Sequence, residues 1–467
     1  MTDTSVEQVE RALARMDEVE GRIASVCTRN DRALDVARGR DAESRDGRTR
    51  GPLHGVPVLV KDNVDTADLP TTAGSLALAG IPHPSRDALL VQHLRDAGMV
   101  VLGKTNLSEW ANIRDENSAS GWSAYGGLTR NPYALNRSAG GSSSGSGAAV
   151  AAGLASYAVG TETDGSISCP AAFNGCVGFK PTVGVVPTEG VVPISSSQDS
   201  PGPLTTTVRE AAALLGVLAG GGTDYAAHAV DGRLAGKRIG VPRARYWGYS
   251  SHADRHAERA VQLLAAEGAT IVDSTDLTSM EDFDEHDELL VLLVELRHGL
   301  EHYLATRPGD GPRTLADVVA FNREHAEVEL RHFGQSLFEQ ALEGPDVDSQ
   351  EYATARARCL QHGRDGIDAV LREHALDALV TPSYGPPVPI DLVNPEAHTG
   401  SCTTPTAVAG YPLLTVPSGL AAGLPVAVSF WGTARSEANL IEIAHGYERA
   451  RNRDTGPLPP PTFEPFV

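Results

Sequence analysis

The amino-acid sequence predicts an α/β fold built on parallel strands. Between residues 56 and 220, short apolar runs alternate with stretches of helical periodicity. This alternation is typical of parallel strands joined by helices. The pattern returns further along the chain, where KRIGVPRA predicts a strand, HAERAVQLLAAEG a helix, and ATIVD and LDALVTPS two more strands. At 467 residues the chain is long enough to bury a large core.

The N-terminal segment predicts a charged amphipathic helix over roughly residues 5–25. Its mixed charges distinguish it from a secretory signal, whose central region is apolar. A polar, charged linker is expected at 39–52. We expect a helical N-terminal region and linker over 1–52 within one domain spanning 1–467, because the segments of a single site extend from Lys61 to beyond residue 400.

The middle of the chain begins with a glycine-rich break at 220–222 and is acidic after Ser279. From there to about residue 375 the sequence predicts mostly helix. The proline-rich tail, GPLPPPTFEP, is expected to be extended and to lie on the surface.

Composition excludes several classes of partner. The formal net charge of −21 argues against nucleic acid and anionic membranes. Five cysteines without paired spacing do not form a disulfide framework, so we expect free core thiols. No stretch reaches the ~20 apolar residues that a membrane span needs. We expect a cytoplasmic monomer or homodimer.

The residues best suited to chemistry lie between Gly140 and Pro170, in GGSSSGSGAAVAAGLASYAVGTETDGSISCP. Glycine lets the main chain approach a ligand closely, and a serine hydroxyl can act as a nucleophile or a proton relay. A serine nucleophile also needs a base. Lys61 is the candidate because it ends the apolar run 56–60, where burial would favour its neutral amine.

These segments and their order resemble the amidase signature family. The matching segments are GVPVLVKDN, the GGSS turn, TDGSI and GFKPT. The likeness extends from about residue 53 to residue 448. It implies a large mixed β-sheet covered by helices on both faces, and a Ser-Ser-Lys triad in place of Ser-His-Asp.

The resemblance assigns the roles by position. It implies that Ser166 is the nucleophile, that Ser142 is the bridging serine, and that Lys61 is the base. It further implies a cis peptide bond before Ser142, and neither cofactor nor metal. The oxyanion would be held by the backbone N–H groups of four consecutive residues: Thr163, Asp164, Gly165 and Ser166.

Within the family, the chain resembles the bacterial peptide amidases, which hydrolyse the C-terminal carboxamide of peptides. GTETDGSISCPAAFNG and VVPISSSQDSPGPL carry this closer likeness, together with LADVVAFNREHAEVELRHFGQSL. The wider family has two glycines before the nucleophile and an arginine two residues after it, whereas this chain has Asp164, Gly165 and Ser168. The likeness implies a small peptide-like amide substrate, an acyl-enzyme and released ammonia. Selectivity is expected in the variable helical region, about 279–375.

Three alternative functions remain, of which two use the same triad and one uses no catalysis. An amidase or acyltransferase acting on a natural-product or aryl amide or ester would use the same triad. An aminoacyl-tRNA amidotransferase subunit would also use it, together with partner subunits. A non-catalytic binding module would have no need of all three triad residues.

Two local patterns suggest other chemistries. The segment GSSSG fits G-x-S-x-G, which would make Ser143 an α/β-hydrolase nucleophile with a late histidine such as His445. The polar, turn-rich sequence before it argues against the strand that such a site requires. His298 and His302 fit the H-x-x-E-H zinc pattern, but Gly299 interrupts a stretch that otherwise predicts an ordinary helix.

Overall fold

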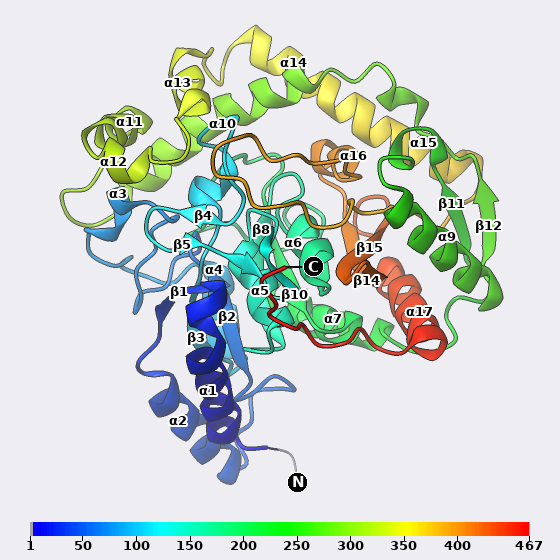
Figure 1. The fold of residues 1–467 in the computed structure, drawn as a ribbon, viewed down its shortest axis with the longest axis horizontal. Helices are drawn as coiled ribbons and strands as arrows, with labels where there is room; N and C mark the ends of the chain where they lie inside the picture. Colours follow the sequence, from blue (N-terminus) through cyan, green and yellow to red (C-terminus); the bar gives the residue numbers. More distant parts are fainter. Residues whose placement is uncertain (1–2, 467) are drawn as a thin grey trace.

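The computed structural model describes residues 3–466 (Figure 1). Its centre is an 11-stranded sheet. In spatial order the strands are β1 (Val26–Arg29), β3 (Val100–Thr105), β2 (Pro57–Lys61), β8 (Tyr157–Glu162), β10 (Ser200–Thr205), β9 (Val177–Lys180), β14 (Leu413–Ala421), β15 (Leu424–Trp431), β13 (Ala378–Pro382), β11 (Arg238–Val241) and β12 (Thr270–Asp273). Because strands from both ends of the chain share this sheet, we infer one domain.

The sheet is mixed, as the family resemblance implies. Strands β3, β2 and β8 run parallel, and so do β13, β11 and β12. The expectation of parallel strands from the alternation over 56–220 is wrong for β10, which lies antiparallel between β8 and β9. Strands β14 and β15 form a hairpin, because Ala422 and Gly423 both have positive φ and make a tight turn that reverses the chain.

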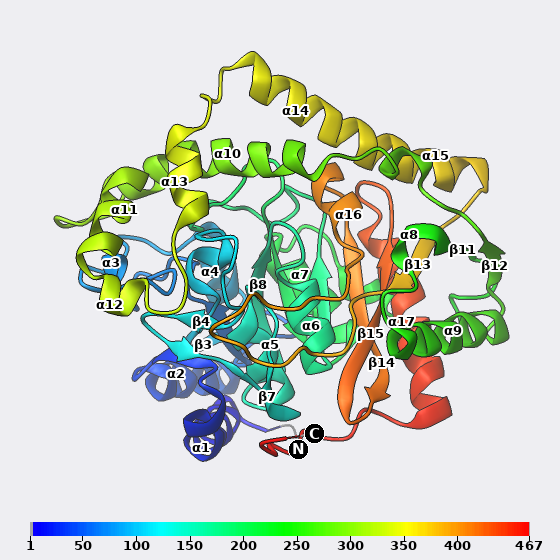
Figure 2. The ribbon, with the colours of Figure 1, turned by 45° about the horizontal axis from the view of Figure 1, so that its top comes forward.

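Helices cover both faces of the sheet (Figures 1 and 2). Alternate residues of β2 show the two layers: Val58 and Val60 belong to one core cluster and Leu59 to another. Helices that line these layers, or lie at their edges, are α3 (Leu76–Ala79), α4 (Leu89–Asp96), α5 (Ser144–Ala151), α6 (Ser168–Asn174), α7 (Val208–Leu218), α8 (Arg243–Tyr246), α9 (Ser251–Ala266), α16 (Thr404–Ala409) and α17 (Glu437–Thr455).

The N-terminal region contains two helices. Helix α1 (Ser5–Ile23) begins at a capping box, in which Thr4 and Glu7 each satisfy the other's backbone N–H group. Helix α2 (Ala33–Arg45) overlaps the expected linker, so that expectation is wrong over its first half. The cause is packing, because Ala33 and Ala37 are buried in the same cluster as the apolar face of α1. This burial stabilises a helix where the polar composition alone predicted a linker.

The acidic middle region is helical, as predicted. It contains α10 (Glu285–Ala305), α11 (Leu315–Glu324), α12 (Ala326–Glu329), α13 (Ser336–Glu343), α14 (Gln350–Leu360) and α15 (Gly366–Glu373). Figure 2 shows these helices arching across one end of the sheet. None of the helices within residues 3–466 is long and apolar enough to cross a membrane.

Four short strands form two small ribbons beside the main sheet. Strand β4 (Trp122–Ser123) pairs with β5 (Gly127–Leu128), and β6 (Arg130–Asn131) pairs with β7 (Ala134–Ser138). The chain then turns from β7 into the glycine- and serine-rich segment before α5. This segment packs tightly. A Cβ atom at Gly145 would collide with the carbonyl oxygen of Ser25 and lie 2.6 Å from that of Asn106.

Replacing Gly145 by alanine therefore tests the packing of α5. We expect Gly145→Ala to lower the free energy of unfolding by about 2 kcal/mol, because backbone atoms must move apart to admit the methyl group. The matched control is Gly39→Ala in α2, where nothing lies within 4 Å of the new Cβ. That variant should gain about 0.5–1 kcal/mol from helix propensity. Urea unfolding measures both, and equal stabilities would contradict the packing described here.

Candidate active site

Three elements of the N-terminal half bring the predicted triad residues to one place. Lys61 is the last residue of β2, a strand buried throughout its length. Ser142 lies in the turn just before α5, and Ser166 lies in the turn between β8 and α6. Since β2 and β8 are parallel neighbours, their carboxyl ends meet at the same edge of the sheet.

The Lys61 amine is fully buried and directly contacts Ser142. Its Nζ atom lies 2.8 Å from Ser142 Oγ, 2.9 Å from Thr161 Oγ1 and 3.3 Å from the Thr161 carbonyl oxygen. Burial lowers the pKa of Lys61 from 10.5 to about 7, although the nearby carboxylates of Asp199 and Glu162 favour the charged form. Near pH 7 the Lys61 amine is therefore neutral in a large share of the protein molecules and able to accept a proton.

Backbone contacts on both sides fix the position of Ser142. The peptide bond between Gly141 and Ser142 is cis, as the family resemblance implies. The Ser142 carbonyl oxygen accepts a hydrogen bond from the Ser108 N–H group at 3.1 Å, and the next residue, Ser143, donates its N–H to the Ser166 carbonyl oxygen at 3.0 Å. The two serine-bearing turns are thus joined through their main chains.

A buried glutamate organises the turn that carries Ser166. Glu162 Oε2 accepts hydrogen bonds from the N–H groups of Ile167 and Ser168 at 2.7 and 2.8 Å, and from Ser168 Oγ at 2.9 Å. These are orphan donors at the start of α6, where a carboxylate is stabilising. Ser168 therefore donates to Glu162 at the position where the wider family has arginine. The sequence analysis did not identify Glu162.

Glycine is required within the same turn. Gly165 has a φ of 86°, and a Cβ atom there would collide with the hydroxyl of Tyr384. Only glycine combines this backbone conformation with so close an approach. The turn consequently keeps its backbone close to the tyrosine that faces it.

Asp199 contacts the turn that carries Ser166. It accepts a hydrogen bond from Thr163 Oγ1 at 2.6 Å, and from the N–H groups of Ile194 and Ser195 at 2.8 and 3.0 Å. This carboxylate therefore caps the loop that begins at Ile194. Burial raises the pKa of Asp199 to about 6.

Asp164 is held differently. One carboxylate oxygen, Oδ2, accepts a hydrogen bond from Thr404 Oγ1 at 2.7 Å. The other, Oδ1, is buried and has no hydrogen-bond partner among residues 3–466. Burial raises the pKa of this carboxyl group above its usual value, which favours its neutral form.

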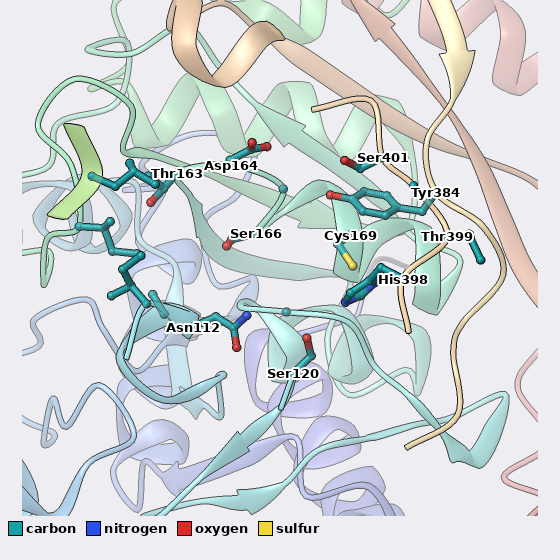
Figure 3. Close-up of a pocket in the computed structure, with 17 residues that line it drawn as sticks. Asn112, Ser120, Thr163, Asp164, Ser166, Cys169, Tyr384, His398, Thr399 and Ser401 are labelled. Atoms are coloured by element: carbon teal, nitrogen blue, oxygen red, sulfur yellow. The ribbon is translucent and has the colours of Figure 1, made fainter. Parts of the chain in front are cut away.

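A cavity of about 490 Å³ opens over Ser166 (Figure 3). Its walls include Thr163, Asp164 and Gly165 of the turn, Leu292 of α10, and the loop segment 398–401. Asn112 and Tyr384 also line it. The volume suits a small molecule or the end of a short peptide.

Sequence reasoning missed Asn112, which lines the cavity because of an unusual backbone bend. Trp110, Ala111 and Asn112 all have positive φ values, a conformation that asparagine tolerates better than most residues. The resulting bend turns Asn112 toward the cavity, where its Oδ1 atom is buried without a protein partner among the described residues. Three consecutive left-handed residues cannot be foreseen from the sequence EWAN alone.

The competing sequence patterns are not assembled into sites. The Ser143 hydroxyl bridges the main chain of Thr161, donating to its carbonyl oxygen at 3.1 Å and accepting from its N–H at 3.2 Å. His445 lies on α17 and contacts Asp231 at 3.1 Å. His298 and His302 are exposed on α10, and no metal-binding group of three or more His, Cys, Asp or Glu side chains occurs in the described part of the chain.

Cysteines take no part in cross-linking among the described residues. All five are free, with Cys27 half-buried and the others buried. The expectation of free core thiols is therefore confirmed, and only Cys169 lines the cavity over Ser166.

The fold and motifs match known proteins along nearly the whole chain. A family model described as Amidase matches residues 7–441. The solved structure of native peptide amidase from Stenotrophomonas maltophilia superposes with a TM-score of 0.91 and 45% identity, covering 99% of this chain and 96% of that one.

Two sequence relatives show the breadth of the similarity. A protein of Arabidopsis thaliana named as a probable amidase is 38% identical over 473 residues, which are 96% of this chain and 87% of that protein. The A subunit of glutamyl-tRNA(Gln) amidotransferase from Symbiobacterium thermophilum is 34% identical over 470 residues, 96% of this chain and 93% of the subunit.

The burial of Lys61 should cost stability in a pH-dependent way. Below about pH 7 the folded protein must bury a charged amine. Between about pH 7 and 10.5 the unfolded chain still binds that proton while the folded protein does not, so the cost fades as pH rises. Lys61→Met should therefore be more stable than the parent near neutral pH, by ~1 kcal/mol or more, with the gain shrinking toward pH ~10.

Denaturant unfolding of both proteins over this pH range provides the measurement. Lys237→Met is the matched control, because Lys237 is half-buried and pairs with Glu442 at 2.9 Å. The control should lose a little stability. A gain for Lys61→Met that did not change with pH would argue against a buried, readily deprotonated amine.

Proposed function

Because the chain belongs to the amidase family and is a hydrolase acting on amide C–N bonds, we propose that it is a serine amidohydrolase with a Ser-Ser-Lys triad. The comparisons confirm the family resemblance, the likeness to bacterial peptide amidases and the large mixed sheet covered by helices. In this proposal Ser166 is the nucleophile, Ser142 the bridging serine and Lys61 the base.

The observation that carries the proposal is the contact between Lys61 Nζ and Ser142 Oγ at 2.8 Å. A serine hydroxyl becomes a useful nucleophile only when a base can take its proton. Lys61 is fully buried, and its pKa of about 7 leaves much of it neutral at physiological pH. A neutral lysine beside a serine hydroxyl supports a proton relay in which no histidine takes part.

The reaction proceeds in two halves. Ser166 Oγ attacks the amide carbonyl carbon, its proton passes to Ser142 Oγ, and the Ser142 proton passes to Lys61 Nζ. The proton then returns along the same path to the leaving nitrogen, the C–N bond breaks, and ammonia leaves an ester on Ser166. A water molecule repeats the attack, releasing the carboxylic acid and free Ser166. No cofactor enters these steps.

Negative charge develops on the carbonyl oxygen during each attack. We assign its stabilisation to the backbone N–H groups of the turn Thr163–Ser166. Glu162 and Asp199 hold this turn from its two ends, which preorganises the donors before the substrate arrives. Losing one such donor typically costs about 3–4 kcal/mol of barrier.

We assign the substrate as a peptide or peptide-like molecule that ends in a carboxamide. The 45% identity to peptide amidase supports this choice, as does a cavity of about 490 Å³ above Ser166. Asn112 and Tyr384 offer polar groups beside apolar Leu292 and Ile194, a mixture suited to a peptide backbone and its side chains.

The similarity to amidotransferase A subunits favours one alternative. Such a subunit is 34% identical to this chain over most of its length. Hydrolysis of an amide by the purified chain without any other subunit would distinguish the two functions. Natural-product and aryl amides or esters remain alternative substrates of the same triad.

Separate substitutions of Ser166 and Ser143 test which of them is the nucleophile. We expect Ser166→Ala to reduce amide hydrolysis by roughly 10³-fold or more, because the acyl-enzyme cannot form. Ser143→Ala should cost far less, since the Ser143 hydroxyl bonds only main-chain groups of Thr161 in the described structure. The measurement is kcat/KM for a carboxamide substrate. Comparable turnover in Ser166→Ala and the parent would refute the triad.

The substrate assignment is tested with a short peptide that ends in a C-terminal amide. The expected products are the free peptide acid and one equivalent of ammonia, with internal peptide bonds intact, because the proposed reaction releases only the terminal NH₂ group. Mass spectrometry and an ammonia assay on the same sample provide the measurement. Internal cleavage, or turnover limited to aryl amides and esters, would overturn the peptide assignment while leaving the amidase chemistry in place.

A further inference from the structure

A second cavity of about 500 Å³ lies away from the active site. It is bounded by α9, the bend of β14 at 418–420, the last turns of α17 and the tail at 456–459. Figures 1 and 2 show α9, β14 and α17 grouped together on the side of the molecule opposite α1. None of its lining residues is shared with the cavity over Ser166.

The lining is basic in a strongly acidic protein. The lining contains three arginines and one histidine but a single carboxylate, that of Asp454; these basic residues are Arg255, His256, Arg259 and Arg451. The whole chain carries a formal charge of −21. A local excess of arginine on such a protein marks a place where an anion is attracted.

Arg451 is the least satisfied of these arginines. Its residue is only 6% exposed, and its Nη2 atom donates to Asn452 Oδ1 at 2.7 Å. Its Nε and Nη1 atoms are buried, and neither has a hydrogen-bond partner among residues 3–466. By contrast, Arg259 pairs with Asp454 and Arg453 pairs with Glu267.

An unpartnered buried guanidinium requires an explanation, because burying charge without hydrogen bonds is costly. Carbonyl groups at the end of α17 attract a cation in general. However, within the described structure Nε and Nη1 of Arg451 donate to none of them. Nε–H and Nη1–H lie on different edges of the guanidinium, so an anion would accept from one of them together with the remaining hydrogen of Nη2. Such a pair of parallel N–H groups matches the two oxygens of a carboxylate or phosphate.

Part of the cavity wall is apolar. Leu263 of α9, Leu420 of β14 and Leu458 of the tail form walls, together with Pro457 and Pro459. An occupant that satisfied Arg451 would therefore place hydrocarbon against these side chains. The volume lies within the range of small-molecule sites.

We propose that this cavity is a binding site for a small organic anion, in which Arg451 holds a carboxylate or phosphate head and the leucine and proline walls hold an apolar body. The site is independent of the amide chemistry proposed for Ser166. Its occupant bridges α9, the β14–β15 hairpin and the tail, and thereby stabilises the packing of the C-terminal segment.

Isothermal titration calorimetry with 3-phenylpropionate tests the proposal on the full chain. We expect binding to the parent and at least tenfold weaker binding to Arg451→Met, because a charge-assisted pair is lost. The matched control is Arg453→Met, two residues away on the same helix, which should bind as the parent does. Any binding in the active site would be equal in all three proteins.

Two further probes separate the parts of the ligand. Inorganic phosphate supplies a charge without an apolar body, and 3-phenylpropanol supplies the body without a charge; both should bind at least tenfold more weakly than 3-phenylpropionate. Tight binding of phosphate alone would overturn the organic-anion assignment. Equal binding of 3-phenylpropionate by the parent and Arg451→Met, or no binding by the parent, would overturn the site.

Stability of the variant provides an independent readout. Without ligand, Arg451→Met should melt at or above the temperature of the parent, because it removes an unpartnered buried charge. A clear loss of stability would indicate a structural role for Arg451 and would count against the proposal. Should Arg451→Met fail to fold, Leu263→Glu keeps Arg451 and places a carboxylate on the cavity wall, and it should likewise abolish binding of 3-phenylpropionate.

Discussion

The structure of the site depends on keeping one lysine amine out of water. Lys61 can be buried because β2 lies between two other strands and every one of its residues is covered. Its partners, Ser142 and Thr161, are neutral, so no carboxylate in contact holds the proton on the amine. The carboxylates of Asp199 and Glu162 raise the pKa of Lys61 and so favour its charged form. Both also accept hydrogen bonds from residues of the segment that carries Ser166. The same carboxylates therefore hold the turn that carries Ser166 and influence the pKa of Lys61.

The outer helices reach this turn through a chain of hydrogen bonds. Glu295 of α10 accepts from Ser195 Oγ at 2.6 Å and from the hydroxyl of Tyr352 on α14, also at 2.6 Å. Ser195 in turn donates its N–H to Asp199, which holds Thr163. The helical region of residues 285–373 is thus connected to the turn that carries Ser166 by polar contacts, and Leu292 of α10 lines the cavity over that turn. Changes in that region can alter both substrate fit and the geometry of the turn.

Sequence reasoning recovered what local chemistry dictates. The apolar run 56–60 predicted the strand that ends at Lys61, and the acidic middle was correctly predicted as helix. The choice of Ser142 and Ser166 came from the family resemblance. Sequence reasoning did not recover features that depend on distant partners. Helix α2 forms by packing against α1, and β10 lies antiparallel between β8 and β9 because of long-range pairing. Asn112 enters the cavity through a backbone bend that no local pattern encodes.

The strand order has a consequence for synthesis on the ribosome. All triad residues lie before residue 167, yet β9, which is buried throughout, finds its outer neighbour only in β14, more than two hundred residues later. Until that hairpin emerges, the nascent chain presents an unpaired, apolar strand edge, the kind of surface that recruits other chains. Thr404 and Tyr384, which contact the turn around Ser166, also arrive late. A truncated translation product would therefore contain Lys61, Ser142 and Ser166 and be prone to aggregate, so completion of the last hundred residues governs the yield of folded protein.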